Sequence, residues 1–110
     1  MTGNELIVDY LTSVPAWYLA TVEDTPEGAQ PHVRPFSFAA LQDGEIQFCT
    51  ATTKDCYREM QANPRVELTA WKPGRGWVIL RGRAKARFHT NMAPPSMAPV
   101  LSRTRYFTAA

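Results

Sequence analysis

The sequence has no long hydrophobic run, few cysteines and, beyond residue 67, no acidic residue at all. No apolar stretch approaches the roughly 20 residues that a helix needs to cross a bilayer. The first residues also lack the basic-then-apolar layout of a secretion signal. These absences predict a cytoplasmic protein without a membrane-spanning helix.

Metal-binding and disulfide motifs are absent as well. Only two cysteines are present, Cys49 and Cys56, and without an export signal we expect them to be free thiols. Neither His32 nor His89 has a nearby cysteine, and the Cys, His and acidic residues form no metal-ligand spacing. We therefore expect no metal site.

The chain has 110 residues, of which 45% are hydrophobic, enough for one domain with a single core. Periodic segments separated by turn residues predict two helices, the first capped by Asn4, and a series of strands. The predicted helices cover residues 5–13 and 54–61, and the predicted strands cover residues 16–22, 31–40, 45–50, 66–71 and 77–88. These elements favour a mainly β protein with a small antiparallel barrel, because closure protects the strand edges.

Basic residues are concentrated late in the chain. Residues 1–67 hold all ten acids and four basic residues, whereas residues 68–110 hold eight basic residues and no acid. Four of the eight recur at every second position and so line one face of the predicted strand 77–88: Arg81, Arg83, Lys85 and Arg87. Such a face is suited to phosphate, to RNA or to an acidic neighbouring chain, or is simply solvated.

A strand that hands over to a helix forms the best candidate anion site. Ile46 and Phe48 alternate with polar residues as in a half-buried strand, and Thr52 or Thr53 is placed to cap the following helix. Free backbone N–H groups at that helix start, the threonine hydroxyls and Lys54 would converge on one anion. The plainer interpretation is an ordinary helix cap beside an exposed lysine.

Several segments together resemble the pyridoxamine 5′-phosphate oxidase-like family of FMN-binding split-barrel proteins. The resemblance extends over about residues 6–88, and it depends on the order and spacing of the motifs rather than on any one of them. The matching segments are WYLATV at 17–22, HVRPF at 32–36, GEIQFCT at 44–50, Lys54, NPRV at 63–66 and GWVILRG at 76–82.

The resemblance implies a split β-barrel of six or so antiparallel strands and a homodimer that holds two flavins between its subunits. It implies that Arg34, Pro35 and Phe36 lie along the flavin, that Cys49 and Thr50 line its ring, that Thr52, Thr53 and Lys54 take its phosphate, and that Trp77 reaches the flavin bound mainly by the other subunit. Two of these residues have plainer alternatives. Trp77 would serve as a core residue, and Arg34 would form a salt bridge with one of the ten acids.

The end of the chain departs from the family pattern. Residues 89–99 contain three prolines and no helix or strand periodicity, and only a short strand around Arg105, Tyr106 and Phe107 is predicted beyond them. We therefore expect a domain over residues 1–88 and a divergent or truncated, loosely ordered tail over residues 89–110.

The favoured function is that of an FMN-dependent oxidoreductase with a small-molecule substrate or electron donor. The flavin would carry the chemistry, and no catalytic acid or base is indicated. The biosynthetic oxidase activity itself is not expected, because the chain has no room for the C-terminal substrate-phosphate motif of those enzymes. The alternative is a non-catalytic binder of flavin, deazaflavin (F420) or haem, and a nucleic-acid-binding barrel ranks last.

Overall fold

A computed structural model describes residues 2–87 and, as a backbone strand, residues 104–109. The chain forms two helices and seven strands: α1 (Gly3–Thr12), β1 (Trp17–Thr25), β2 (Gly28–Phe36), β3 (Ala40–Gln42), β4 (Glu45–Ala51), α2 (Asp55–Ala62), β5 (Arg65–Lys72), β6 (Gly76–Arg87) and β7 (Thr104–Ala109). Within the described part of the chain, neither helix is long and apolar enough to cross a membrane. The predicted mainly β fold is confirmed.

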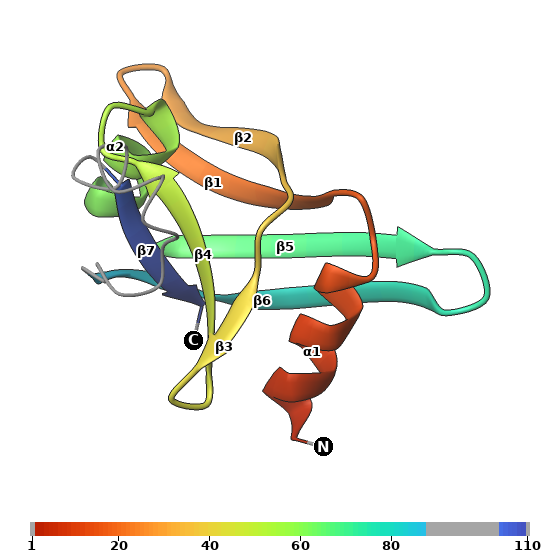
Figure 1. Cartoon of the computed structure of the whole chain (residues 1–110). Coiled ribbons are helices and arrows are strands. Elements are labelled where there is room, and N and C mark those ends of the chain that lie inside the picture. The colour runs from red at the N-terminus through yellow and green to blue at the C-terminus, as the bar shows by residue number, and fades with distance from the viewer. Residues whose placement is uncertain (1, 88–103, 110) are drawn as a thin grey trace.

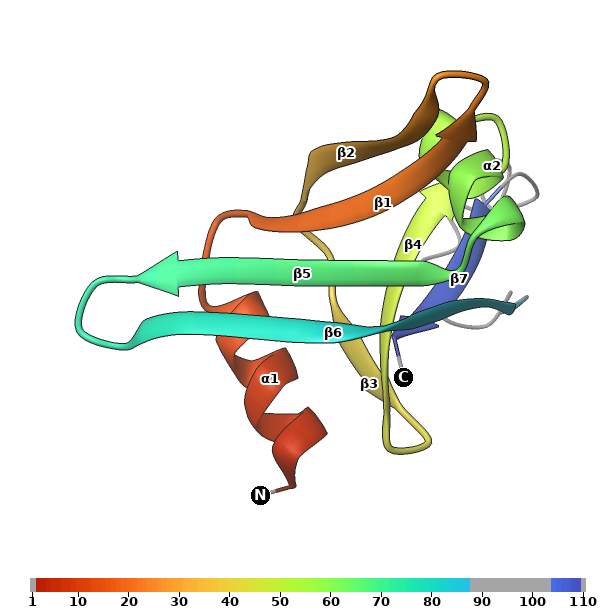
Figure 2. The ribbon, with the colours of Figure 1, turned by 180° about the vertical axis from the view of Figure 1, so that it is seen from behind.

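All seven strands join one antiparallel sheet in the order β2-β1-β5-β6-β7-β4-β3. The sheet bends so that its two halves face each other, with β4 and β7 crossing in front of β1 and β5 in Figure 1 and behind them in Figure 2. Strand β6 belongs to both halves, because its first part pairs with β5 and its last part with β7. This arrangement agrees with the split barrel that the family resemblance implied.

Strand β7 pairs on both sides, with β4 and with β6. The short strand predicted around Tyr106 therefore exists, is longer than predicted and lies inside the sheet. Residues 89–103 of the predicted loosely ordered tail (89–110) lie outside the described residues, so the domain boundary at residue 88 stays a prediction.

The core joins the two halves of the sheet through aromatic rings. Trp17 of β1 stacks on Phe36 of β2 with ring centroids 5.1 Å apart, and Phe48 of β4 meets both rings edge-on at 5.6 Å. Leu11, Leu19 and other apolar side chains complete this core. Because Phe36 also ends β2, the core fixes the position of the residues just before it.

Strand β4 differs from the predicted half-buried alternation. Gln47 is only 1% exposed, as deeply buried as its neighbours Ile46 and Phe48. The prediction of one solvent-facing side is therefore wrong for Gln47. The strand lies between β3 and β7 and contacts both helices.

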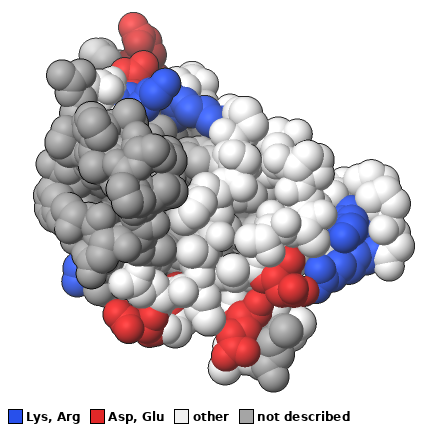
Figure 3. Space-filling view, viewed as in Figure 1, with Lys and Arg blue, Asp and Glu red and all other residues white. Residues whose placement is uncertain are grey.

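Helix α1 is anchored to the turn between β5 and β6. The Tyr10 hydroxyl donates to the carbonyl of Gly76, and Arg75 lies over the Tyr10 ring and donates to Asp9 at 2.8 Å. Figure 3 shows this contact as acidic side chains over α1 beside basic ones at the end of the β5–β6 hairpin.

The predicted cap of helix α1 is wrong: Thr2 accepts from the N–H of Glu5, and Asn4 instead donates to Gly44 O at 2.8 Å. Thr2 fits because the helix begins two residues earlier than the apolar pattern indicated.

Candidate functional site

The segment between β4 and α2 forms a tight turn in which the N–H of Lys54 donates to the carbonyl of Ala51 at 3.0 Å. Lys54 itself occupies the cap position, with extended backbone and no side-chain cap hydrogen bond. The prediction that Thr52 or Thr53 caps α2 is therefore wrong, because both threonines fall within the preceding turn. The first N–H groups of α2 are left available to another acceptor.

A cavity of about 420 Å³ opens beside this turn. It is lined by residues of three elements: Arg34, Pro35 and Phe36 at the end of β2, Thr50 on β4, and Lys54, Asp55 and Cys56 at the start of α2. Five of the nine residues that we nominated from the sequence are thus brought together. The cavity is within the usual size range of small-ligand sites, roughly 300–1,000 Å³.

The other four nominated residues do not line this cavity. Cys49 is half-buried on β4, where burial raises the pKa of its thiol, and Thr52 and Thr53 lie in the adjoining turn. Trp77 lies at the β5–β6 hairpin, at the opposite end of the molecule from α2 in both views of the ribbon. Its side chain is 74% exposed, so the alternative that Trp77 is a core residue is wrong.

Sequence reasoning missed Asp55 and Cys56 as cavity residues. Cys56 Sγ lies 3.1 Å from Thr50 Oγ1, linking the first turn of α2 to β4. The position of Asp55 and Cys56 directly after Lys54 in the sequence was the available signal. A third missed residue, Glu59, is buried with Cys56 and Met60 on one face of α2, and an acid within an apolar i, i+3, i+4 pattern would have revealed it.

Arg34 lines the cavity and also forms the salt bridge that was its plainer alternative. Its Nη1 and Nη2 donate to the two carboxylate oxygens of Glu59 at 2.7 and 3.0 Å. The Thr21 hydroxyl donates to Glu59 Oε1 at 2.6 Å. The Arg34 guanidinium, helped by Thr21, lowers the pKa of Glu59 to about 2, and Glu59 in turn raises the pKa of Arg34.

Lys54 differs from Arg34 in having no such partner. Among the described residues it forms no ion pair or hydrogen bond through its side chain, whereas Asp55 lies 3.6 Å from Arg58 Nη2. At the cavity, the Lys54 ammonium is therefore not engaged by any side chain that the structure describes. An anionic ligand group would find it available.

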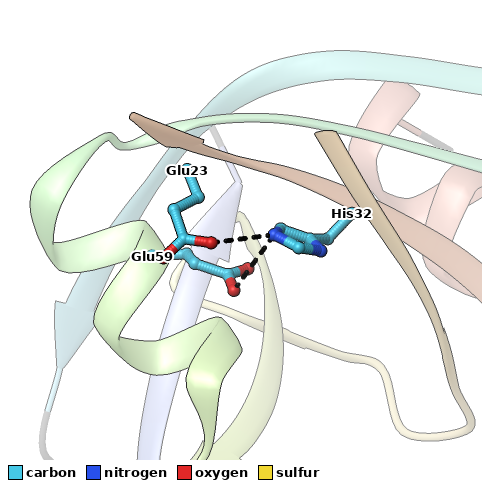
Figure 4. Close-up of side chains that lie close together, drawn as sticks. All are labelled: Glu23, His32 and Glu59. Atoms are coloured by element: carbon cyan, nitrogen blue, oxygen red, sulfur yellow. Dashed lines mark hydrogen bonds and ion pairs between the residues drawn. The ribbon is translucent and has the colours of Figure 1, made fainter. Parts of the chain in front are cut away.

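A histidine and a second carboxylate extend the network around Glu59. Figure 4 shows His32 Nε2 directed at both carboxylates, 3.1 Å from Glu23 and 3.7 Å from Glu59. Arg58 donates to Glu23 at 2.8 Å, and this contact, followed by that of His32, lowers the pKa of Glu23. The three potential metal ligands Glu23, His32 and Glu59 thus lie close together, but two guanidiniums already offset the two carboxylates. The donor set suits an ion-pair network rather than a cation site.

The outer face of β1, β2, β5 and β6 carries a group of exposed apolar side chains. We call it the outer patch, and it comprises Tyr18, Val33, Trp71, Trp77 and Ile79. The strand register places Trp71 opposite Trp77 and Thr69 opposite Ile79. The predicted basic face continues along β6 from this patch, since Arg81, Arg83 and Lys85 are exposed there, with Arg81 bonded to Glu67 at 3.3 Å. The side chain of Arg87 is outside the described residues.

The cavity beside a strand-to-helix turn and the bent antiparallel sheet agree with one family. The family model for pyridoxamine 5′-phosphate oxidase matches residues 4–103. The chain belongs to this family. No curated protein matches the chain.

Solved structures of family members share the fold. A NimC/NimA family protein from Clostridium acetobutylicum superposes with a TM-score of 0.78 at 23% identity, covering 98% of this chain and 80% of that one. An F420 reductase superposes with a TM-score of 0.69 at 21% identity, covering 99% of this chain and 93% of that one. General stress protein 26 from Bacillus anthracis superposes with a TM-score of 0.70 at 12% identity, covering 94% of this chain and 84% of that one. At these identities the likeness shows the fold alone.

Proposed function

We propose that this family member binds FMN and acts as a cytoplasmic oxidoreductase on a small-molecule substrate or electron donor. One observation carries the proposal: the cavity between β2, β4 and α2 holds a lysine at a helix start that has no side-chain partner among the described residues, beside four other residues that the resemblance assigns to flavin binding. When bound, the flavin supplies the redox chemistry, accepting electrons from a donor and passing them to a small acceptor. The protein supplies binding, orientation and charge.

Each end of the cavity suits a different part of FMN. Lys54 and the first N–H groups of α2 suit the phosphate, since a helix start is an anion site and a charged donor strengthens it. Phe36, which is part of the aromatic core, and Thr50 provide an apolar and a hydroxyl-bearing wall for the ring. Thr52 and Thr53 adjoin the phosphate end and act on it from the turn, and Cys49 lies on the same strand as Thr50.

We also propose that the protein is a homodimer, and the outer patch supports this. Exposed aromatic residues clustered on a sheet face are typical of protein interfaces, and monomers seldom expose large contiguous apolar patches. A second copy would cover this face. Because Trp77 lies far from the cavity of its own chain, it would serve the flavin bound mainly by the partner.

A deazaflavin is the favoured alternative cofactor, because one structural relative is an F420 reductase. Haem is less favoured, since His32 is engaged by Glu23 and Glu59. A non-catalytic flavin carrier would use the same cavity. RNA binding draws only on the basic face of β6 and leaves the cavity unexplained.

The visible spectrum of the purified protein, followed by titration of the ligand-free protein with FMN, tests the proposal. Twin flavin bands and stoichiometric FMN binding are expected, together with a dimer by sedimentation. A single violet band would indicate a deazaflavin, and a Soret band would indicate haem. A monomer that holds stoichiometric FMN would overturn the shared site while leaving FMN binding intact.

A further inference from the structure

Glu59 is the one carboxylate buried in the described part of the chain, with 2% of its surface exposed. Removing a carboxylate from water is costly unless it is paired and hydrogen-bonded. Replacing such a pair with well-packed apolar residues is often neutral or stabilising, so a buried pair is weak evidence of a stabilising role. Glu59 on the inward face of α2 therefore calls for a role beyond stability.

The contacts of Glu59 determine where Arg34 lies. Two parallel N–H···O bonds form a fork that fixes the plane of the guanidinium. Thr21 reinforces both partners, because it donates to Glu59 and accepts from Arg34 Nη1 at 3.2 Å. Two elements, β1 through Thr21 and α2 through Glu59, thus hold one side of the guanidinium that β2 carries.

The opposite side of Arg34 remains available to a ligand. Its side chain is 30% exposed and lines the cavity next to Phe36 and Lys54. The fork leaves Arg34 little freedom to rotate away, so little ordering entropy is lost when a ligand contacts it. The Arg34 guanidinium thus forms a wall of the cavity and is fixed on its other side by Glu59 and Thr21.

We propose that Glu59 is a positioning residue that orients Arg34 in the cofactor cavity, with Thr21 as its helper; this inference rests on the proposed FMN site. Glu59 touches no ligand and acts only through Arg34. It also offsets the charge of Arg34, so that Lys54 supplies most of the attraction for an anionic ligand group and Arg34 supplies a fixed planar contact.

The groups around Glu59 support this role. His32 and Arg58 approach its Oε2 at 3.7 and 3.9 Å, and Glu23 engages both of them. The charges of the two carboxylates and the two guanidiniums cancel, so the network needs no further charged group from the cavity. Glu23 serves as a matched control, since it belongs to the same network but has no contact with Arg34 among its recorded bonds.

The test is a double-mutant cycle in FMN affinity, measured by flavin fluorescence on wild type, Glu59→Gln, Arg34→Lys and the double variant. Loss of the charged fork in Glu59→Gln should weaken FMN binding about tenfold, the factor for one charge-assisted hydrogen bond. In the Arg34→Lys background the same change should cause no further weakening, because lysine cannot form the fork. Equal losses in both backgrounds would overturn the proposal and leave Glu59 a structural residue.

Two further variants keep the test decisive if Glu59→Gln folds poorly. Thr21→Val removes the helper hydroxyl without changing charge, and it should weaken FMN binding by a smaller factor, about threefold. Glu23→Gln should leave FMN affinity unchanged. Melting of the ligand-free proteins separates both effects from unfolding, and a loss in Glu23→Gln as large as in Thr21→Val would overturn the assignment.

A readout without cofactor separates this inference from the proposed function. The rate at which phenylglyoxal modifies Arg34 in the ligand-free protein, followed by peptide mass spectrometry, should rise in Glu59→Gln and stay unchanged in Glu23→Gln. If wild type bound no FMN, the proposed function would fall and this rate alone would decide. Equal modification rates in wild type and Glu59→Gln would then overturn the positioning role.

Discussion

The α2 end and the β5–β6 hairpin end of the molecule differ in how their side chains are paired. At the α2 end, Glu23, Arg34, Arg58 and Glu59 pair with one another across β1, β2 and α2, whereas the Lys54 side chain has no partner among the described residues. At the hairpin end, aromatic residues such as Trp71 and Trp77 are exposed to solvent. Under the proposed function, the first end would bind an anion and the second would be covered by another protein surface.

The largest expected effect comes from breaking the completed end. Arg34→Ala removes the bidentate partner of the buried Glu59 carboxylate and should destabilise the fold by about 3 kcal/mol, the low end for a broken buried pair because Arg34 is partly exposed and Thr21 and Arg58 remain near Glu59. Chemical denaturation measures this loss. Adding Glu59→Gln should restore part of the stability, since it removes the stranded charge. A double variant less stable than Arg34→Ala would contradict the pairing.

The next effect concerns the hairpin end. Trp77→Ala should weaken dimerisation by about 2–3 kcal/mol, as expected of an interface tryptophan, with little change in the stability of one protomer. Sedimentation equilibrium measures the dimer constant. Leu6→Ala is the matched control, because Leu6 is also exposed but lies on α1. Equal effects of the two substitutions would show that the outer patch has no special role.

Lys54→Ala sharpens the comparison at the anion site. Loss of a charge-assisted bond of about 1.5–3 kcal/mol should weaken FMN binding by roughly ten- to a hundredfold. Riboflavin, which lacks the phosphate, should lose little affinity. Lys85→Ala is the control, since Lys85 is an exposed lysine on β6. Similar losses for both ligands would assign Lys54 to the ring or to the fold.

A smaller effect is expected for the two turn threonines. Thr52→Ala and Thr53→Ala should each weaken FMN binding by about 0.5–1.5 kcal/mol, the contribution of a neutral hydrogen bond, and should spare riboflavin. Neither should lower the melting temperature through a lost helix cap, because Lys54 occupies that position. A clear loss of stability without loss of affinity would reverse this assignment.

The last effect is a loss of stability in acid, and it concerns Glu59. Its pKa is lowered from 4.5 to about 2, so its pairing stabilises the fold above pH about 4.5, and this contribution is lost as the pH falls toward about 2. Denaturation of wild type and Glu59→Gln across this range measures it. The variant should lack this part of the acid sensitivity, and parallel pH profiles would show that Glu59 is not held as the structure indicates.

Local patterns were sufficient for most of the fold. Alternation and turn residues located both helices and most strands, and motif order indicated the family. Sequence patterns were insufficient where long-range register decides. Glu59 meets Arg34 because β1 and β2 pair with Leu19 opposite Arg34, which places Arg34 and Thr21 on the face that α2 covers. A pattern along one segment carries no information about which strand faces which helix.

The same limit explains the errors near the site. A threonine next to a helix is a good cap candidate, yet the turn from Ala51 to Lys54 moves the start of α2 past both threonines. Gln47 looked solvent-facing because polar residues usually are, but β4 is an interior strand that both helices contact. The cavity itself was predictable only in part, since its β2 wall depends on the pairing of distant segments.

The position of β7 between β4 and β6 has a consequence for the order in which the protein assembles. Until residues 104–109 are in place, β4 and β6 each present an unpaired edge, and the β4–β7 contact joins segments more than fifty residues apart. Contacts this distant slow folding, and open strand edges invite pairing with other chains. The nascent protein is therefore most prone to aggregation just before this strand inserts, and shortening the chain by a few residues at β7 would prolong that vulnerable interval.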